Sequence, residues 1–495
     1  MSDTEEKIIT KGESGLYLCG RRKIYTSESI TKDNVVSIIN RVLSVHLMNL
    51  QQEETLYWYE RGIQPILNRS KEVRPEICNK IVVNNASQIV TFWNGYFMIS
   101  PASYVANEEE VTDEVKTFND YCKAAKKHIV DNKTIDWFNK VGLGIIFVEP
   151  NKDDKRPFNV YSLDPRSAFV VYSLSPGNRP VMGVNMVVTD TNEVTFDVYT
   201  EEYYFKLRGT LIGETVIKTP IVSTPIGVIE VKKNQIGKVP FIEYQYNNDR
   251  MCCFENGIPI MDEINTLESN RADAVEQQVQ QLMVATNCNF DDDVTANDIR
   301  KAGMIVLKST GENKADFKLL ETSLSQSETQ VSLDALYEQL LDKTGLPSIS
   351  RNEGGSSDNG SAVYLKSGFT IADTMRRNTE DLWRESDMYF REVALSILSR
   401  KGFELHPDDF DIVIEPPTMS NLLVKTQSAM NMRELGLHPQ IWLERSGLSN
   451  DPQQDIELSK DYIYKFYENK STPEAEGQAL ADDRQIEELS SYELD

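Results

Sequence analysis

The stretch Asn256-Gly-Ile-Pro-Ile-Met-Asp-Glu-Ile-Asn-Thr-Leu267 opens a block that ends at Arg400 and decides the fold. Its first asparagine and the proline three residues later are typical of a helix start. Apolar residues then recur at helical steps as far as Leu282, while most other positions carry charged or amide side chains. We therefore expect a helix that packs its one narrow apolar face on like helices and turns its polar side toward water.

A second helix follows after an interruption. The helical period stops after Cys288, and the polar segment beyond it predicts a small excursion with a strand or two. Leucines at 333, 336, 340 and 341 then predict a return helix that ends at Gly345, with Pro347 just beyond.

A polar loop and a long helix complete the block. Residues 350–361 are rich in glycine and serine and contain no apolar side chain, so we expect a mobile loop. From Ala362 a stripe of apolar residues with a 3.6-residue period continues to the end of the block, and Gly368 is the expected kink.

The chain before this block is predicted to begin with helices and to continue with strands. Helices are expected over residues 32–52, 84–93 and 115–128, the first leading into an aromatic turn at Tyr57–Tyr59. We interpret the basic run from Lys123 to His128 as the solvated face of a helix. From Gly142 onward, short β-rich runs predict one antiparallel sheet. These runs cover residues 145–148, 168–172, 181–188, 194–199, 203–207 and 226–231.

After the block, the pattern predicts a strand and two helices. The strand covers residues 412–414, and the helices cover 421–434 and 438–445 with Gly436 between them. Beyond Lys470 the sequence is acidic and poor in aromatic residues, which is typical of disorder or a marginal helix.

Composition limits the possible functions. Lysine and arginine total 52 against 77 aspartate and glutamate, a formal charge of −25 that argues against a tight, sequence-independent grip on nucleic acid. The six cysteines show no metal-ligand spacing, which predicts free thiols. The start of the sequence is acidic and no apolar run approaches 18 residues, so we expect neither secretion nor membrane spanning.

Motifs that would carry catalysis are missing from the sequence. It has no Gly-x-x-x-x-Gly-Lys-Ser/Thr loop, no His-Glu-x-x-His helix and no Gly-x-Ser-x-Gly elbow. Gly142-x-Gly144 lacks the third glycine of a dinucleotide fingerprint. We therefore expect no catalytic residues, no metal and no cofactor.

The order of parts, together with several short motifs, resembles the portal (head-to-tail connector) proteins of tailed bacteriophages, of the siphophage-type branch. The resemblance covers about residues 40 to 470. The motifs are Leu56-Tyr-Trp-Tyr-Glu-Arg-Gly62, Ile81-Val-Val-Asn-Asn-Ala86, Gly95-Tyr96, Val239-Pro-Phe-Ile-Glu-Tyr244, Ile260-Met-Asp-Glu-Ile-Asn265, Leu435-Gly-Leu-His438 and Asp455-Ile-Glu-Leu458.

The resemblance implies an α+β fold with the regions of a portal protein, mostly helical with a β-rich wing insert. Residues 1–257 would form the N-terminal wing, β-rich over 142–246, and 362–417 its long helix and strand. Residues 258–287 and 327–345 would form the stem, 288–326 the clip and 346–361 the tunnel loop. Residues 418–470 would form the crown, and 471–495 an acidic tail.

The resemblance also implies a ring, typically of twelve copies, at a unique capsid vertex of the virion, assembled in the cytoplasm of the host bacterium. Such a ring would nucleate procapsid assembly and conduct double-stranded DNA during genome packaging and ejection, without sequence specificity. It would dock the terminase large subunit, a head-completion or adaptor protein, and the major capsid and scaffolding proteins. An acidic channel wall would keep DNA loosely centred, because a strongly basic one would bind it.

Three sets of residues are candidates for these roles. In the clip, partner contacts are expected at Asp291, Asp292, Asp293, Arg300 and Lys301. In and beside the tunnel loop, DNA contacts are expected at Ser348, Ser350, Arg351, Asn352, Asn359, Ser361 and Lys366. In the stem, packing is expected through Ile264, Leu267, Val275, Val279 and Leu282.

Two other classes of protein fit the composition. One is a large cytoplasmic enzyme whose site is built from scattered carboxylates, and the other is a non-viral scaffolding protein. Particle size separates them, because a ring near twelve subunits favours the portal class, and a monomer with a closed pocket favours an enzyme.

Overall fold

The structure is a computed structural model in which two compact units can be described. It describes residues 20–279 apart from 73, 109–110, 189–192, 215–219 and 223–226. Further along it describes residues 283–286, 288–289, 308–309, 316–319, 326–347, 369–415, 422–446, 448–449, 455–456 and 458–460. The first unit lies within Met1–Phe97, Asp120–Asp358 and Ala362–Pro407, and the second within Met98–Asn119, Asn359–Ser361 and Asp408–Asp495.

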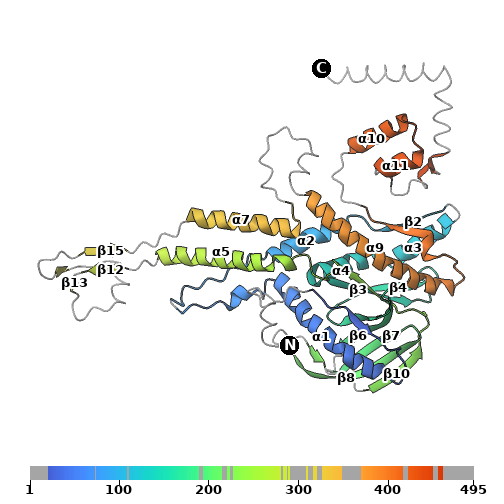
Figure 1. Cartoon of the computed structure of the whole chain (residues 1–495), viewed down its shortest axis with the longest axis horizontal. Helices are drawn as coiled ribbons and strands as arrows, with labels where there is room; N and C mark the ends of the chain where they lie inside the picture. The colour runs from blue at the N-terminus through green and yellow to red at the C-terminus, as the bar shows by residue number, and fades with distance from the viewer. Residues whose placement is uncertain are drawn as a thin grey trace, which may run out of the picture. The chain divides into compact units, whose positions relative to one another are not determined.

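A seven-stranded sheet covered by helix α1 (Val35–Glu60) forms one side of the first unit (Figure 1). The sheet has the order β1-β5-β6-β7-β8-β10, with β9 paired to β8. All described pairs are antiparallel except that of β1 with β5. The strands are β1 (Ile24–Thr26), β5 (Ala168–Ser173), β6 (Pro180–Val188), β7 (Glu193–Thr200), β8 (Tyr203–Glu214), β9 (Pro220–Val222) and β10 (Gly227–Lys233).

Apolar residues on one face of α1 fill the space above this sheet. Ile38, Ile39 and Leu43 at helical spacing are buried against Val184 and Phe196 from alternate positions of β6 and β7. The apolar residues whose spacing predicted the helix and those whose alternation predicted the strands therefore pack together in one core.

A second sheet of three strands packs against the first, and it contains the run that was wrongly assigned. The order is β11 (Phe241–Gln245), β3 (Leu143–Pro150) and β4 (Phe158–Leu163). Residues 145–148 were expected in the same sheet as the other runs, but they lie in β3, at the centre of this separate sheet. The run is continuously apolar rather than alternating, because β3 is covered on both faces. The sheets approach closely where Gly183 meets the ring of Phe241, since a Cβ there would lie 2.2 Å from that ring.

Helices α2 (Asn85–Phe97), α4 (Lys127–Val141) and α9 (Phe369–Ser399) complete the first unit. Helix α4 packs on β3, and α9 packs on β11. The indole of Trp383 in α9 is buried against Tyr244 of β11, with ring centroids 4.2 Å apart. The expected kink at Gly368 lies outside the described residues.

Two helix boundaries differ from those expected. The aromatic residues Tyr57 to Tyr59 are not a turn, because α1 continues through them to bury Tyr59 in a second, helical core before Gly62 ends it with φ +88°. The single helix expected over 115–128 is two, α3 (Thr112–Ala124) and α4, separated at Lys126, whose φ is +56°.

The second core joins α1, α2, α9 and two further helices, α5 (Ile258–Val279) and α7 (Gln326–Thr344). Short strands lie between these two helices, as predicted. Strand β12 (Met283–Thr286) pairs with β15 (Asp316–Leu319), and β13 (Cys288–Asn289) pairs with β14 (Lys308–Ser309). Single turns of 3-10 helix occur at η1 (Pro65–Asn68), η3 (Glu255–Gly257) and η5 (Pro407–Asp409).

In the second unit, β2 (Ser103–Ala106) pairs with β16 (Phe410–Val413). The rings of Tyr104, Phe118 and Phe410 pack together, with centroids 5.0 to 5.5 Å apart. Helices α10 (Leu422–Glu434) and α11 (Pro439–Ser446) are joined at Gly436, whose φ is +79°. The strand and both helices expected here are confirmed. No helix within the described ranges is both long enough and apolar enough to cross a membrane.

Candidate interaction site: the α5–α7 hairpin and its strap

Helices α5 and α7 form an antiparallel hairpin (Figure 1). The guanidinium of Arg271 donates to Gln330 Oε1 at 3.0 Å, and Gly257 meets Leu340 at the other end, so the two helices run in opposite directions. A Cβ on Gly257 would lie 2.7 Å from Leu340 Cδ1, which shows why glycine stands at this crossing. Ile264, Leu333 and Leu340 are buried between the helices and the body of the unit. Each such side chain contributes about 1.5 to 3 kcal/mol by burial.

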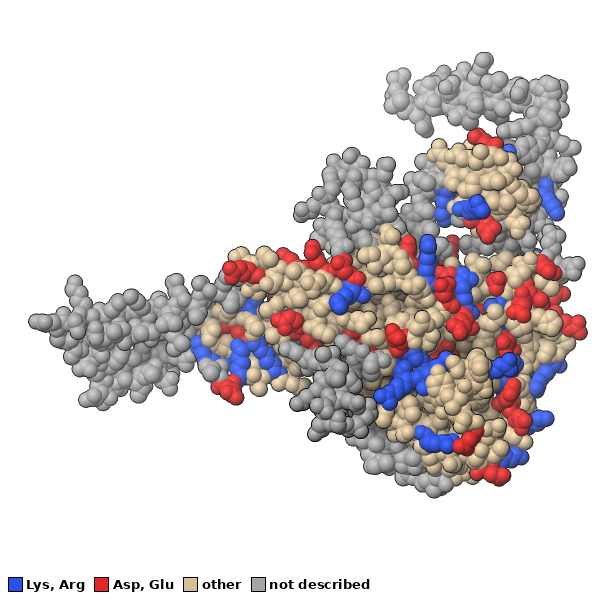
Figure 2. All heavy atoms as spheres, viewed as in Figure 1, with Lys and Arg blue, Asp and Glu red and all other residues tan. Residues whose placement is uncertain are grey.

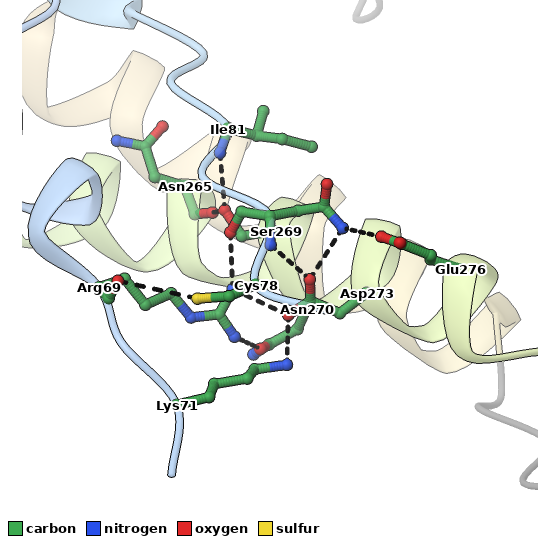
Figure 3. A network of polar contacts seen from close by, with 10 residues as sticks. Arg69, Lys71, Cys78, Ile81, Asn265, Ser269, Asn270, Asp273 and Glu276 are labelled. Carbon is green, nitrogen blue, oxygen red and sulfur yellow. Dashed lines mark hydrogen bonds and ion pairs between the residues drawn. The ribbon is translucent and has the colours of Figure 1, made fainter. Parts of the chain in front are cut away.

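The opposite side of α5 is covered by an extended segment of the same chain, residues 61–84, which we call the strap. Three backbone N–H groups of the strap donate to polar side chains of α5. Asn79 donates to Asp273 Oδ1 at 2.7 Å, Ile81 to Ser269 Oγ at 3.0 Å, and Val83 to Asn265 Oδ1 at 2.9 Å. Figure 3 shows this network around Ser269 and Asp273.

The spacing of these contacts follows from chain geometry. Two residues of extended chain advance about 6.6 Å, and four residues of α-helix advance about 6 Å. Every second amide of the strap therefore meets every fourth side chain of α5 as the two run in opposite directions. The polar residues Asn265, Ser269 and Asp273 supply the acceptors that the strap's amides would otherwise take from a neighbouring strand.

Asp273 is the most highly connected of these acceptors. Its side chain is 4% exposed and forms ion pairs with Lys71 and with Arg69, the latter at 3.1 Å. Asn79 also donates to it through its side-chain amide at 2.9 Å. Burial alone would raise the pKa of Asp273, but hydrogen bonds from Lys71 and Asn79 outweigh it and hold the pKa below its usual value. The carboxylate is therefore charged at neutral pH and fixes the outer part of the strap.

The inner end of the strap is tied by the side-chain amide of Gln64, next to a buried Tyr59–Asp262 pair. Gln64 accepts a hydrogen bond from Asn265 Nδ2 at 2.6 Å and donates to the backbone oxygen of Tyr59 at 3.2 Å. The phenol of Tyr59 donates to Asp262 at 2.8 Å. Burial and the nearby Asp262 raise the pKa of Tyr59, so its hydroxyl stays protonated and remains a donor.

The strap corrects one expectation from the sequence. The polar side of α5 was expected to face water, but Asn265, Ser269 and Asp273 are buried under the strap. A helix can bury polar side chains when each is hydrogen-bonded, and the strap's amides provide those bonds. The residues of α5 that remain exposed lie mostly on one narrow arc of the helix. Among the described positions this arc contains Pro259, Glu263, Asn270 and Gln277, and Val275 is also exposed.

The predicted stem residues have different positions within one chain. Ile264 is fully buried and Leu267 packs on the same core, so both stabilise the subunit itself. Val275 is 51% exposed. Val279 is the last residue of α5, and its side chain, like Leu282, lies outside the described residues. The residues predicted for the clip contacts and the tunnel loop also lie outside them, so those roles stay predictions.

A buried ionic cluster in α4 was missed by the sequence interpretation. Lys127 was expected on a solvated helix face, but it is 4% exposed. Its Nζ lies 2.9 Å from both carboxylate oxygens of Asp131 and 3.5 Å from Asp387 of α9. Burial alone would lower the pKa of Lys127, but the two carboxylates raise it. The four-residue spacing of Lys127 and Asp131 was the available signal, since the residues can pair on one helix face.

Other titratable groups are also buried in the first unit. Burial raises the pKa of the Cys122 thiol, and also those of Cys252 and Cys253, which form part of the helical core. Burial raises the pKa of Glu53 to about 8 despite the nearby Arg21. In the part of the chain that the structure describes, no three His, Cys, Asp or Glu side chains gather in a way that could hold a metal ion. The hairpin and strap present exposed charged side chains, a surface suited to contact with another macromolecule.

The chain matches a known protein family. A family model described as "Phage portal protein, SPP1 Gp6-like" matches residues 39–463, which include both sheets, the hairpin, the strap and helices α10 and α11. No curated protein matches the chain.

Proposed function

The chain belongs to the SPP1 Gp6-like family of phage portal proteins, and we propose from this that it assembles into a ring, typically of twelve copies, at one vertex of the capsid. In this role the ring is the channel through which double-stranded DNA enters during packaging and leaves during ejection. It also nucleates procapsid assembly.

The observation that carries this proposal is the family match over residues 39–463, which spans most of the chain. Within that match, the antiparallel α5–α7 hairpin supports a stem of residues 258–287 and 327–345. The layered unit with its two sheets supports the wing, and helices α10 and α11 support the crown. The clip at 288–326 is the proposed docking region for the terminase large subunit and the adaptor or head-completion protein. Capsid and scaffolding proteins are the remaining proposed partners.

The charge of the chain is compatible with a channel through which DNA slides. DNA carries about one negative charge per 1.7 Å, so a continuous basic wall would retain it by counterion release. A chain with a formal charge of −25 offers little such retention. The proposed tunnel loop, residues 346–361, together with Lys366, supplies Arg351 and Lys366 as separate, transient phosphate contacts.

Mass measurement and negative-stain electron microscopy of the purified full-length protein test the proposal. Twelve copies of the 56.4 kDa chain give a particle of about 680 kDa with a central hole. A protein that remains a monomer over the whole accessible concentration range, with scaffolding protein added, would contradict the ring.

A further inference from the structure

The face of α7 that points away from α5 carries a regular, mostly acidic stripe. Five side chains at alternating three- and four-residue steps form it: Glu328, Val331, Ala335, Glu338 and Asp342. This is the side of the helix opposite the buried Leu333 and Leu340. All five are exposed, and Val331 is 69% exposed. We call this stripe the acidic face.

The strap presents a surface of opposite charge. Its sequence contains five basic and two acidic residues in a chain that is otherwise strongly acidic. Arg61 and Lys80 are exposed, and the side chain of Lys71 is 30% exposed beside Asp273. Large apolar side chains are exposed among them, namely Ile63, Leu67, Ile81 and Val83. We call this combination of basic and apolar side chains the basic face.

The two faces lie on opposite sides of α5. Asn265, Ser269 and Asp273 of α5 point to the strap, whereas Ile264 and Arg271 point to α7. Figure 1 shows α5 between the strap and α7, and Figure 2 shows acidic side chains along the α7 edge and basic ones along the opposite edge. One chain therefore carries a surface and its electrostatic complement, pointing in opposite directions.

We propose that the basic face of one copy of this chain packs against the acidic face of α7 in the next copy. The proposal rests on the ring assembly proposed above and assigns the surfaces that build it. Val331 and Ala335 would meet the apolar side chains of the strap. Glu338 and its acidic neighbours would meet Lys80 and Arg61.

A second copy is the partner that fits both faces at once. Contact between like faces would bring two acidic stripes or two basic straps together, which electrostatic repulsion disfavours. Contact between unlike faces is head-to-tail, so a row of copies keeps one unpaired basic face at one end and one unpaired acidic face at the other. Addition of copies continues until the two ends of the row meet and close a ring. The basic side chains of the strap also reduce the net repulsion between two copies of a protein of formal charge −25.

Charge reversal at exposed positions tests this pairing. Lys80→Glu alters the basic face and Glu338→Lys alters the acidic face, and neither position lies in a core. We expect each single variant to need a roughly tenfold or higher protein concentration for ring formation. A chain carrying both changes should recover, because each interface then contains a reversed pair. Lys152→Glu, an equal charge change at an exposed turn, serves as the control and should assemble like the wild type.

A mixing experiment tests the direction of the contact. One variant has its strap blocked by Leu67→Asp with Lys80→Glu, and the other has α7 blocked by Val331→Asp with Ala335→Asp, so both blocked faces are acidic and repel each other. Unchanged circular dichroism and melting temperature would show that both fold. Each should remain monomeric alone, and their mixture should give a one-to-one dimer without rings, measured by mass photometry.

The outcomes separate this proposal from the proposed function. A wild-type protein that forms rings while either blocked variant also forms them would overturn the assignment of the faces and leave the ring intact. Failure of the charge-swapped chain to recover, together with a mixture that stays monomeric, would overturn it as well. A wild-type protein that never assembles would instead overturn the ring itself.

Discussion

Replacing Asp273 by alanine should release the outer strap from α5 while the rest of the subunit stays folded. The carboxylate accepts two hydrogen bonds from Asn79, at 2.7 and 2.9 Å, and pairs with Lys71 and Arg69. Hydrogen bonds to a charged group contribute about 1.5 to 3 kcal/mol each. The two cations are partly exposed, so water compensates much of their loss.

We therefore expect a cost of about 3 kcal/mol for local opening of the strap, since these contacts are not additive. At about 1.4 kcal/mol per factor of ten, the amide N–H groups of Asn79 and Ile81 should exchange roughly a hundredfold faster. Hydrogen exchange followed by mass spectrometry on peptides covering residues 74–84 measures this directly. Asp273→Asn keeps an oxygen acceptor for Asn79 and should cause a smaller increase. Glu263→Ala, on the exposed arc of the same helix, is the matched control.

The pH dependence follows from the same carboxylate. Its pKa in the folded chain lies below the ordinary value of 3.8, so its contribution is present above that value and is lost as the pH falls through the folded pKa. Strap exchange in the wild type, corrected for intrinsic rates, should thus be constant near neutral pH and rise below about pH 4. If the Asp273→Ala strap keeps wild-type protection at neutral pH, the carboxylate does not hold it and the reasoning is wrong.

Three other predictions concern buried groups of the first unit and the proposed tunnel loop. Lys127→Met leaves Asp131 and Asp387 buried without their cation, so it should lower the free energy of unfolding by about 3 to 5 kcal/mol, measured by thermal or urea unfolding. Lys123→Met, at an exposed position, is the control and should change that free energy by less than about 0.5 kcal/mol. Equal effects of the two variants would refute the role of the cluster. Burial lowers the pKa of His46 to about 4, although its hydrogen bond with the backbone oxygen of Arg166 opposes this shift. The neutral ring therefore contributes about 3 kcal/mol to the free energy of unfolding above pH 6.5, and this contribution is lost as the pH falls toward 4. His46→Gln should flatten the stability curve in that window, and an unchanged slope would count against it. Deleting residues 354–360 of the tunnel loop should leave ring formation intact and shorten the packaged DNA, and normal packaging and retention would refute a role of the loop in handling DNA.

Local signals in the sequence predicted those elements that have marked ends or a regular apolar period. Asn256 and Pro259 marked the start of α5, and Gly345, with φ +69°, marked the end of α7. The alternation in residues 194–199 predicted β7. The motifs that resembled portal proteins led to the family that the comparison confirms.

Errors arose where distant contacts decide the structure. Residues 145–148 are apolar on both faces, which fits a strand in any sheet. Pairing with Phe158–Leu163 and with Phe241–Gln245, the latter far along the chain, places them in the second sheet. Lys127 resembles its exposed neighbours in sequence, but Asp387 of α9 lies beside it in the fold. The strap has no apolar period because polar contacts with α5 hold it, made by three backbone amides and by side chains such as Lys71 and Asn79. A pattern of hydrophobicity contains no information about such bonds.

The two proposals made for this chain constrain each other through the geometry of α5. If the strap and α7 contact neighbouring copies, these contacts follow the circumference of the ring. The exposed arc of α5 between the strap and α7 must then point along the radius of the ring, either toward the bore or toward the outside. That arc contains Glu263 and Gln277, and at its border Asn270 accepts a hydrogen bond from Arg69 of the strap. A bore-facing arc of this composition would present DNA mainly with acid and amide groups, which offer little counterion release. Under both proposals, the charge that joins the copies would lie on the sides of the proposed stem, away from the path of DNA. A charge-swap experiment that fails to support the joining faces would remove the basis for this orientation too.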